Sequence, residues 1–126
     1  MKFVARIILF SVFLSFLHFP GNAWSEEETV VPVKDTVTML DLGSETCIPC
    51  KMMAPILEEL KAEYKGRAEI IFVNVRKDQS LSQRLKVLVI PTQIFYDKHG
   101  KEIYRHTGFY SKEEMKKWLD ELIERS

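Results

Sequence analysis

The sequence has little that would indicate binding of nucleic acid, phosphate or metal. Its 18 basic and 18 acidic side chains cancel, and no run of Lys or Arg is longer than two. A basic surface for nucleic acid is therefore not expected. The chain has only two cysteines and three histidines, one of them (His18) in the N-terminal segment considered next. A structural zinc site usually takes four such ligands, so no zinc site of that kind is expected.

Long hydrophobic runs are also missing. The longest, Ile7–Phe19, has 13 residues, whereas a helix that spans a membrane needs about 20. Lys2 and Arg6 precede it, and small residues follow at the −3 and −1 positions of a cleavage site after Ala23. This pattern predicts a signal peptide at residues 1–23 and a protein that is periplasmic or otherwise exported. The alternative is a membrane anchor formed by residues 7–19.

After this segment the chain predicts one domain. Residues 24–36 are expected to be a tether or an edge segment, in which Pro32 cannot donate to a sheet, and residues 37–126 to be the domain itself. Alternation and helical spacing of apolar residues predict strands at Val37–Leu42, Glu69–Val75, Thr92–Tyr96 and Glu102–Thr107, and helices at Cys47–Lys65, at Leu81–Leu85 and after Ser111.

Local signals support several of these elements. Ser111 with Glu114 forms a capping box for the last helix, and Ser80 is a possible cap for the short one. The apolar Glu69–Val75 is typical of a strand covered on both faces. The order β-α-β-α-β-β-α predicts an α/β fold with a mixed central sheet flanked by helices. The chain contains no internal repeat and no low-complexity segment.

The two cysteines, Cys47 and Cys50, are three residues apart at the start of a predicted helix. A disulfide between them closes a very short loop and contributes little stability. Haem attachment needs a histidine directly after the second cysteine, where this chain has Lys51. Reversible redox chemistry fits better, because a helix N-terminus lowers the pKa of a thiol from about 8.5 toward about 7. Cys50, one turn later, would stay protonated until it is needed.

The residues around this pair resemble the thioredoxin family. The resemblance runs from Val37 to Ile123 and depends on Asp41, "CIPCKMMAPILEEL", "VIPTQIFYDKHGKE" and "GFYSKEEMKKWLDEL". It implies a thioredoxin fold, an exposed nucleophile at Cys47 and a resolving thiol at Cys50. It also implies a cis peptide at Ile90–Pro91 beside the disulfide, where backbone groups of Ile90 can pair with an extended substrate.

Further site residues follow from their positions. A charged residue between two leucines of a central strand needs a role, and Asp41 is interpreted as the proton acceptor for Cys50. The residues expected to contact the substrate are Thr46, Ile48, Pro49, Ile90, Pro91 and Gly108. Neither a cofactor nor a metal is expected.

The sequence departs from the family at three places near the site and in the length of its N-terminal portion. Thr46 stands where thioredoxins usually have tryptophan, and Ile48-Pro49 replaces their Gly-Pro. Phe72 occupies the position of a lysine that lies near the buried aspartate, so Asp41 is expected to ionise less readily than in its relatives. Only about 13 residues separate Ala23 from the first strand. The N-terminal portion is therefore expected to be shortened, without one edge element of a full thioredoxin.

These features predict a thiol-disulfide oxidoreductase that reduces disulfides of exported proteins. Two cysteines cannot recharge themselves, so a membrane electron donor is expected as a partner. Alternatives are a thiol oxidant, which would need a membrane oxidase, a reductase for cytochrome c maturation, and a non-enzymatic thioredoxin-like module that binds metal through the same thiols. The protein is expected to be a monomer that does not bind nucleic acid.

Overall fold

The structure, a computed structural model, describes residues 30–126. The predicted signal peptide, its alternative as an anchor, and residues 24–29 of the tether lie outside this range. Among the described residues, no helix is long and apolar enough to cross a membrane. Residues 30–36, expected as a tether or an edge segment, form no strand, and the Val33 amide donates instead to Thr38 Oγ1 at 3.1 Å.

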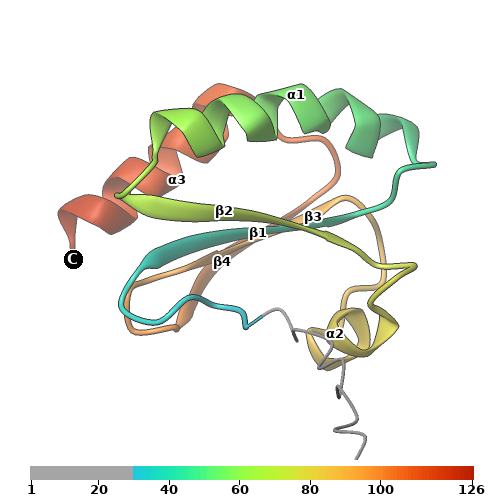
Figure 1. The fold of residues 1–126 in the computed structure, drawn as a ribbon, viewed down its shortest axis with the longest axis horizontal. Coiled ribbons are helices and arrows are strands. Elements are labelled where there is room, and N and C mark those ends of the chain that lie inside the picture. The colour runs from blue at the N-terminus through green and yellow to red at the C-terminus, as the bar shows by residue number, and fades with distance from the viewer. Residues whose placement is uncertain (1–29) are drawn as a thin grey trace, which may run out of the picture.

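The described chain forms a mixed sheet with helices on both faces (Figure 1). The strands lie in the order β2-β1-β3-β4; β1 pairs parallel with β2 and antiparallel with β3, and β3 pairs antiparallel with β4. The elements are β1 (Val37–Gly43), α1 (Ile48–Glu63), β2 (Ala68–Asn74), α2 (Gln79–Arg84), β3 (Thr92–Tyr96), β4 (Glu102–Thr107) and α3 (Lys112–Glu124). The predicted element order and the α/β fold class are confirmed.

Two apolar clusters hold the layers together. On one face, α1 and α3 pack on the sheet around Met39, Leu60 and Phe95. On the other face, α2 packs through Leu81 against a smaller cluster that includes Leu42. The side chains of β1 alternate between the two clusters, and every residue of β1 is buried. The central strand is therefore covered on both faces.

The helix termini show which local signals were sufficient. The capping box predicted for α3 is present, with Ser111 as the cap and Glu114 bonding back to it. The short helix α2 differs from its prediction, because Asp78 rather than Ser80 is its cap. The Asp78 carboxylate accepts from the Leu81 amide and from the Ser80 hydroxyl, both at 2.9 Å. A carboxylate reaches both donors, so Ser80 is held by the cap instead of forming it.

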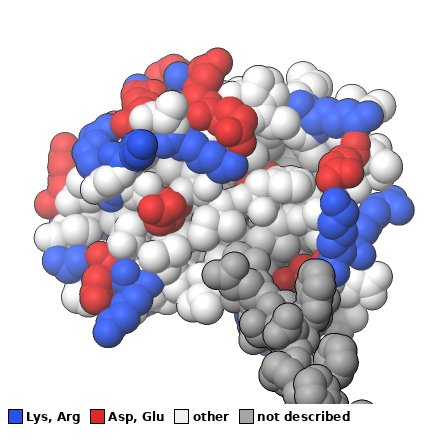
Figure 2. All heavy atoms as spheres, in the orientation of Figure 1, with Lys and Arg blue, Asp and Glu red and all other residues white. Residues whose placement is uncertain are grey.

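The strand β2 is covered on both faces, as its composition predicted, because Ile70 belongs to the cluster with α1 and α3 and Val73 to the cluster with α2. The strand lies at the edge of the sheet, paired only with β1 in the described part of the chain, and its Glu69 and Phe72 are exposed. An apolar run alone does not distinguish an edge strand from a central one. Figure 2 shows charged side chains of both signs around the rim of this view, without a broad surface of one sign.

Candidate active site

The two cysteines lie where α1 begins. Cys47 is the N-cap residue, and its Sγ accepts the backbone N–H of Cys50 at 3.4 Å. The two sulfurs form a disulfide, with the Cα atoms 5.3 Å apart. Cys47 is half-buried, whereas Cys50 is 4% exposed. The helix N-terminus, which favours a negative charge, therefore acts on the more accessible of the two sulfurs.

A tight turn between β1 and α1 positions Cys47. The Ser44 hydroxyl accepts from the Thr46 amide at 3.2 Å and bonds the Thr46 hydroxyl at 3.0 Å. The Cys47 amide donates to the Ser44 carbonyl at 3.2 Å. Thr46 itself is exposed directly before the disulfide, and Ile48 directly after Cys47 is 75% exposed. Both predicted contact residues are therefore accessible to a partner molecule.

Gly43, at the end of β1, allows α1 to approach the sheet closely. A Cβ at this position would lie 3.3 Å from Cys50 Sγ and 3.0 Å from Cε2 of Phe72. Carbon atoms in contact normally lie about 3.5–4.0 Å apart. Gly43 was not among the site residues predicted from the sequence. The position two residues after Asp41 and four before Cys47 was the only available signal.

The peptide between Ile90 and Pro91 is cis, as the resemblance implied. Pro91 precedes β3, whose first residue Thr92 lies opposite Leu42 of β1. Pro91 is therefore at the same end of the sheet as Gly43 and the disulfide. The Gly108 amide, at a φ of 101° that favours glycine, donates to the Pro91 carbonyl at 2.7 Å. The fold thus brings three of the predicted segments to one end of the sheet.

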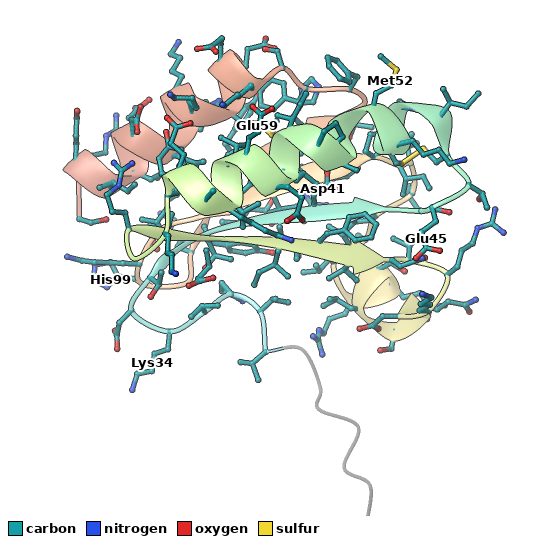
Figure 3. The ribbon with its side chains drawn as sticks, turned by 45° about the horizontal axis from the view of Figure 1, so that its top comes forward. Lys34, Asp41, Glu45, Met52, Glu59 and His99 are labelled. Atoms are coloured by element: carbon teal, nitrogen blue, oxygen red, sulfur yellow. A yellow bond between two sulfur atoms is a disulfide. The ribbon has the colours of Figure 1, made fainter. Side chains whose placement is uncertain are left out.

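Asp41 lies in the middle of β1, fully buried. It is opposite Phe72 on β2 and opposite Gln93 on β3. The Gln93 amide donates from Nε2 to Asp41 Oδ1 at 2.8 Å, while Asp41 Oδ2 has no hydrogen-bond partner. Figure 3 shows Asp41 on β1 beneath α1. Phe72, at the position that carries lysine in thioredoxins, thus lies beside the carboxylate and offers it a phenyl ring in place of a cation.

This environment opposes ionisation of Asp41. Burial raises the pKa of the carboxyl from 3.8 to about 6, and the hydrogen bond from Gln93 acts in the opposite direction by favouring the charged form. The expectation that Asp41 ionises reluctantly agrees with its surroundings. A carboxyl with a pKa near neutrality can both accept and release a proton, which suits it to act on a thiol.

A groove of about 430 Å³ opens beside Cys50. Its walls come from α1, with Ala54, Pro55 and Leu57, and from Phe72 of β2. Gly43 and Asp41 are alternate residues of β1 and so face the same side of the sheet, about 7 Å apart along the strand. Cys50 therefore lies between a solvent-accessible groove and the end of the strand that carries the buried carboxylate.

Gln93 is a second residue of the site that was not predicted from the sequence. Its side chain is fully buried and contacts both Asp41 and, at 3.3 Å, Met53 Sδ. The available signal was a glutamine within the apolar strand "TQIFY", since a buried polar group requires a hydrogen-bond partner. In residues 30–126 no three His, Cys, Asp or Glu side chains are grouped so that they could hold a metal ion.

Comparison with known proteins gives consistent matches. The family model described as Thioredoxin matches residues 23–121. Proteins named Thioredoxin from Staphylococcus aureus strains Mu50 / ATCC 700699 and MW2 are each 39% identical over 88 residues, which are 70% of this chain and 84% of theirs. A solved chain described as "Structure of a malarial protein" has a TM-score of 0.64 and 24% identity, over 69% of this chain and 97% of that one, and so shares the fold.

The contact at Gly43 predicts that a methyl group there is destabilising. We expect Gly43→Ala to lower the free energy of unfolding of the oxidised protein by about 1–3 kcal/mol, because Phe72 or Cys50 must move. Urea unfolding measures the loss. The double variant Gly43→Ala, Phe72→Leu should recover part of it by removing the closest contact. An unchanged stability of Gly43→Ala would mean that Phe72 turns aside freely.

The burial of Asp41 predicts how stability depends on pH. Its pKa is about 6 in the folded protein against an ordinary 3.8, so the folded state binds the proton more tightly, and stability falls as pH rises from about 4 to about 6. We expect Asp41→Asn to raise the free energy of unfolding by up to about 3 kcal/mol above pH 6.5, with little effect below pH 4. Chemical denaturation at several pH values measures this difference.

Asp35→Asn, which removes an exposed carboxylate, is the control for net charge. If Asp41→Asn is less stable than the unaltered protein at pH 7.5, hydrogen bonding of the carboxylate outweighs the cost of its burial.

Proposed function

Because the chain belongs to the thioredoxin family, we propose that it is a thiol-disulfide oxidoreductase that reduces disulfides of exported proteins through Cys47 and Cys50. The observation that carries this proposal is the disulfide itself, with Cys47 as the accessible cap of α1 and Cys50 buried behind it. A structural role would gain little from so short a loop.

The proposed reaction moves two electrons from the protein dithiol to the substrate disulfide. The Cys47 thiolate attacks one substrate sulfur, so a mixed disulfide forms and the other substrate sulfur leaves as a thiolate. Cys50 then gives its proton to Asp41 and attacks Cys47 Sγ. The Cys47–Cys50 bond forms, the bond from Cys47 to the substrate breaks, and the second substrate sulfur leaves as a thiolate. Each leaving thiolate takes a proton from solvent or from the site.

The direction of electron flow is inferred from the residues between the cysteines. The dipeptide Ile48-Pro49 lacks the histidine that strongly oxidising enzymes have between their cysteines. Its proline, Pro49, resembles the reducing enzymes instead. Export of the protein is proposed from residues 1–23 and would require a membrane protein to supply electrons. An oxidant that works with a membrane oxidase is the competing assignment, because exported compartments are oxidising.

The exposed apolar side chains suggest the kind of substrate. Met52 projects from the first turns of α1 (Figure 3). Other large apolar residues are exposed like Met52, and they lie in the segments that carry Cys47, Pro91 and Gly108. They are Ile48, Leu88, Val89 and Phe109. Exposed apolar side chains that gather in a few adjoining segments are typical of an interaction surface. An extended polypeptide with apolar residues near its disulfide fits such a surface.

The proposed direction predicts the midpoint potential of the Cys47–Cys50 pair. We expect a value between about −270 mV, as for thioredoxin, and about −180 mV, as for disulfide isomerase, and nearer the former. The reasons are the charge-stabilising helix terminus and the proline between the cysteines. Equilibration in glutathione buffers measures it. A value more positive than about −150 mV would assign the protein as an oxidant.

The proposed roles of the two cysteines predict different products when each is removed. Cys50→Ala should leave partners attached to Cys47 as mixed disulfides, because the resolving thiol is missing. Cys47→Ala should trap few partners, because Cys50 is buried and lies away from the helix cap. Non-reducing gels of the exported fraction after expression of each variant show the adducts, and the trapped partners identify the substrate class.

Equal adduct yields from the two variants would show that the nucleophile is assigned wrongly. Adducts from neither variant would favour metal binding by the same thiols.

A further inference from the structure

The buried carboxylate of Asp41 has one hydrogen-bond donor in the described structure, and that donor is neutral. Gln93 Nε2 lies 2.8 Å from Asp41 Oδ1, and Oδ2 is unpartnered. Both side chains are fully buried. A carboxylate in this position is usually neutralised by a cation or protonated. Gln93 is thus the one group that can favour the charged form of Asp41 by direct contact.

We propose that Gln93 is a positioning residue that holds Asp41 ready to accept the proton of Cys50, in place of a cation. The first part, the effect on the charge of Asp41, stands on the geometry alone. The second part, the effect on Cys50, rests on the proposed oxidoreductase function.

The register of the sheet fixes the pair. Asp41 and Gln93 lie directly opposite each other on β1 and β3, so their side chains leave the same face of the sheet side by side. Met53 of α1 contacts Gln93 Nε2 from above at 3.3 Å. Gln93 Oε1 has no partner. The amide is therefore oriented with its donor end on the carboxylate, since the reverse orientation would place two acceptor oxygens against each other.

Among residues 30–126, no charged side chain replaces Gln93 in this role. On β2, the residue opposite Asp41 is Phe72. Beyond Phe72, four charged residues line the groove, and two of them, Lys61 and Glu58, pair with each other at 2.7 Å. The four are Glu45, Lys51, Glu58 and Lys61.

The remaining helices and strands of the described part of the chain also supply no direct partner. On β4, His106 lies opposite Gln93 but stacks on Tyr110 and bonds the Phe109 carbonyl. The last helix, α3, presents buried Met115 and Leu119 to the sheet. Two of its three lysines, Lys112 and Lys116, form ion pairs with glutamates of α1, and Lys117 is exposed to solvent. The two cysteines are the remaining titratable groups close to the strand end.

The consequence for the reaction is a dependence on pH. Cys50 can transfer its proton to Asp41 only when the carboxylate is ionised. Without the amide donor, the carboxylate would remain protonated to a higher pH. Resolution of the mixed disulfide would then slow in the range where the unaltered protein still has its base.

The test uses Gln93→Leu, which removes the donor and keeps a side chain of similar bulk. In the oxidised protein, the carboxyl carbon of Asp41 is followed by NMR through a pH titration and is assigned by its absence from Asp41→Asn. We expect the midpoint to rise by about one pH unit in Gln93→Leu. No turnover is involved, so this readout does not depend on the proposed function.

The kinetic readout is the rate at which Cys50 resolves a mixed disulfide between Cys47 and a small aromatic thiol. A shift of about one pH unit should slow Gln93→Leu about five-fold at pH 6 and hardly at pH 8. Asp41→Asn should be slow at both pH values. Phe95→Leu is the matched control, since Phe95 lies on the same face of β3 and is also buried. It should lose stability without moving either midpoint.

A compensating variant distinguishes a charge effect from a packing effect. Gln93→Leu, Phe72→Lys places a cation opposite Asp41 on β2, and we expect it to return the NMR midpoint to the unaltered value or below. If Gln93→Leu does not fold, Gln93→Met, which is closer to glutamine in length, takes its place with the same expected shift.

An unchanged NMR midpoint in the folded Gln93 variant would overturn the proposal, as would an equal shift in Phe95→Leu. A shifted NMR midpoint with an unshifted pH profile of resolution would overturn its second part, because Asp41 would then not be the base for Cys50. If the unaltered protein reduces no disulfide at all, the proposed function fails, and the titration still decides the first part.

Discussion

The site depends on the complete burial of β1. Val37–Gly43 is buried at every position, because β2 and β3 flank it and helices cover both faces of the sheet. Such a strand should be apolar, and its one ionisable residue is Asp41. The same strand ends at Gly43, where the missing side chain lets Cys50 pack against the sheet. One central strand therefore sets both the depth of the carboxylate and the position of the disulfide.

The burial of Asp41 lowers the stability of the folded protein at the site of the proposed reaction. A protein that buries an ionised carboxylate with one neutral hydrogen bond is less stable than the same protein with an apolar residue of that size in its place. The lysine that thioredoxins carry on the neighbouring strand would offset that cost and also hold the carboxylate in its charged form. With Phe72 there instead, the pKa of Asp41 is about 6. Small changes in its surroundings then change its charge near neutral pH, as is common for groups that transfer protons.

The sequence was sufficient where the signals are local. Alternating apolar residues and a turn predict β3 and β4, and both strands have the predicted bounds. A motif of four residues predicts the capping box of α3, which is present. The sequence was insufficient where the answer depends on pairing between distant segments. The contact between Asp41 and Gln93 joins residues 52 positions apart, and only the register of β1 with β3 creates it. The edge position of β2 likewise depends on which strands flank it, and its apolar composition does not reveal this.

The two sulfurs of the disulfide face different surroundings, which in the proposed reaction separates recognition from proton transfer. Cys47 is at the helix cap, next to exposed Ile48 and Thr46, where a partner chain can approach. Cys50 lies behind it, against Gly43 and on the groove that α1 forms with Phe72. In thioredoxins the longer lysine at that position would reach toward the carboxylate, whereas the phenyl ring forms one wall of the groove here. Cys50 is 4% exposed, and the groove that it lines is the open side of this otherwise buried residue. In the proposed reaction, in which Asp41 accepts the proton of Cys50, this open side of the sulfur would be the route by which that proton reaches solvent between turnovers.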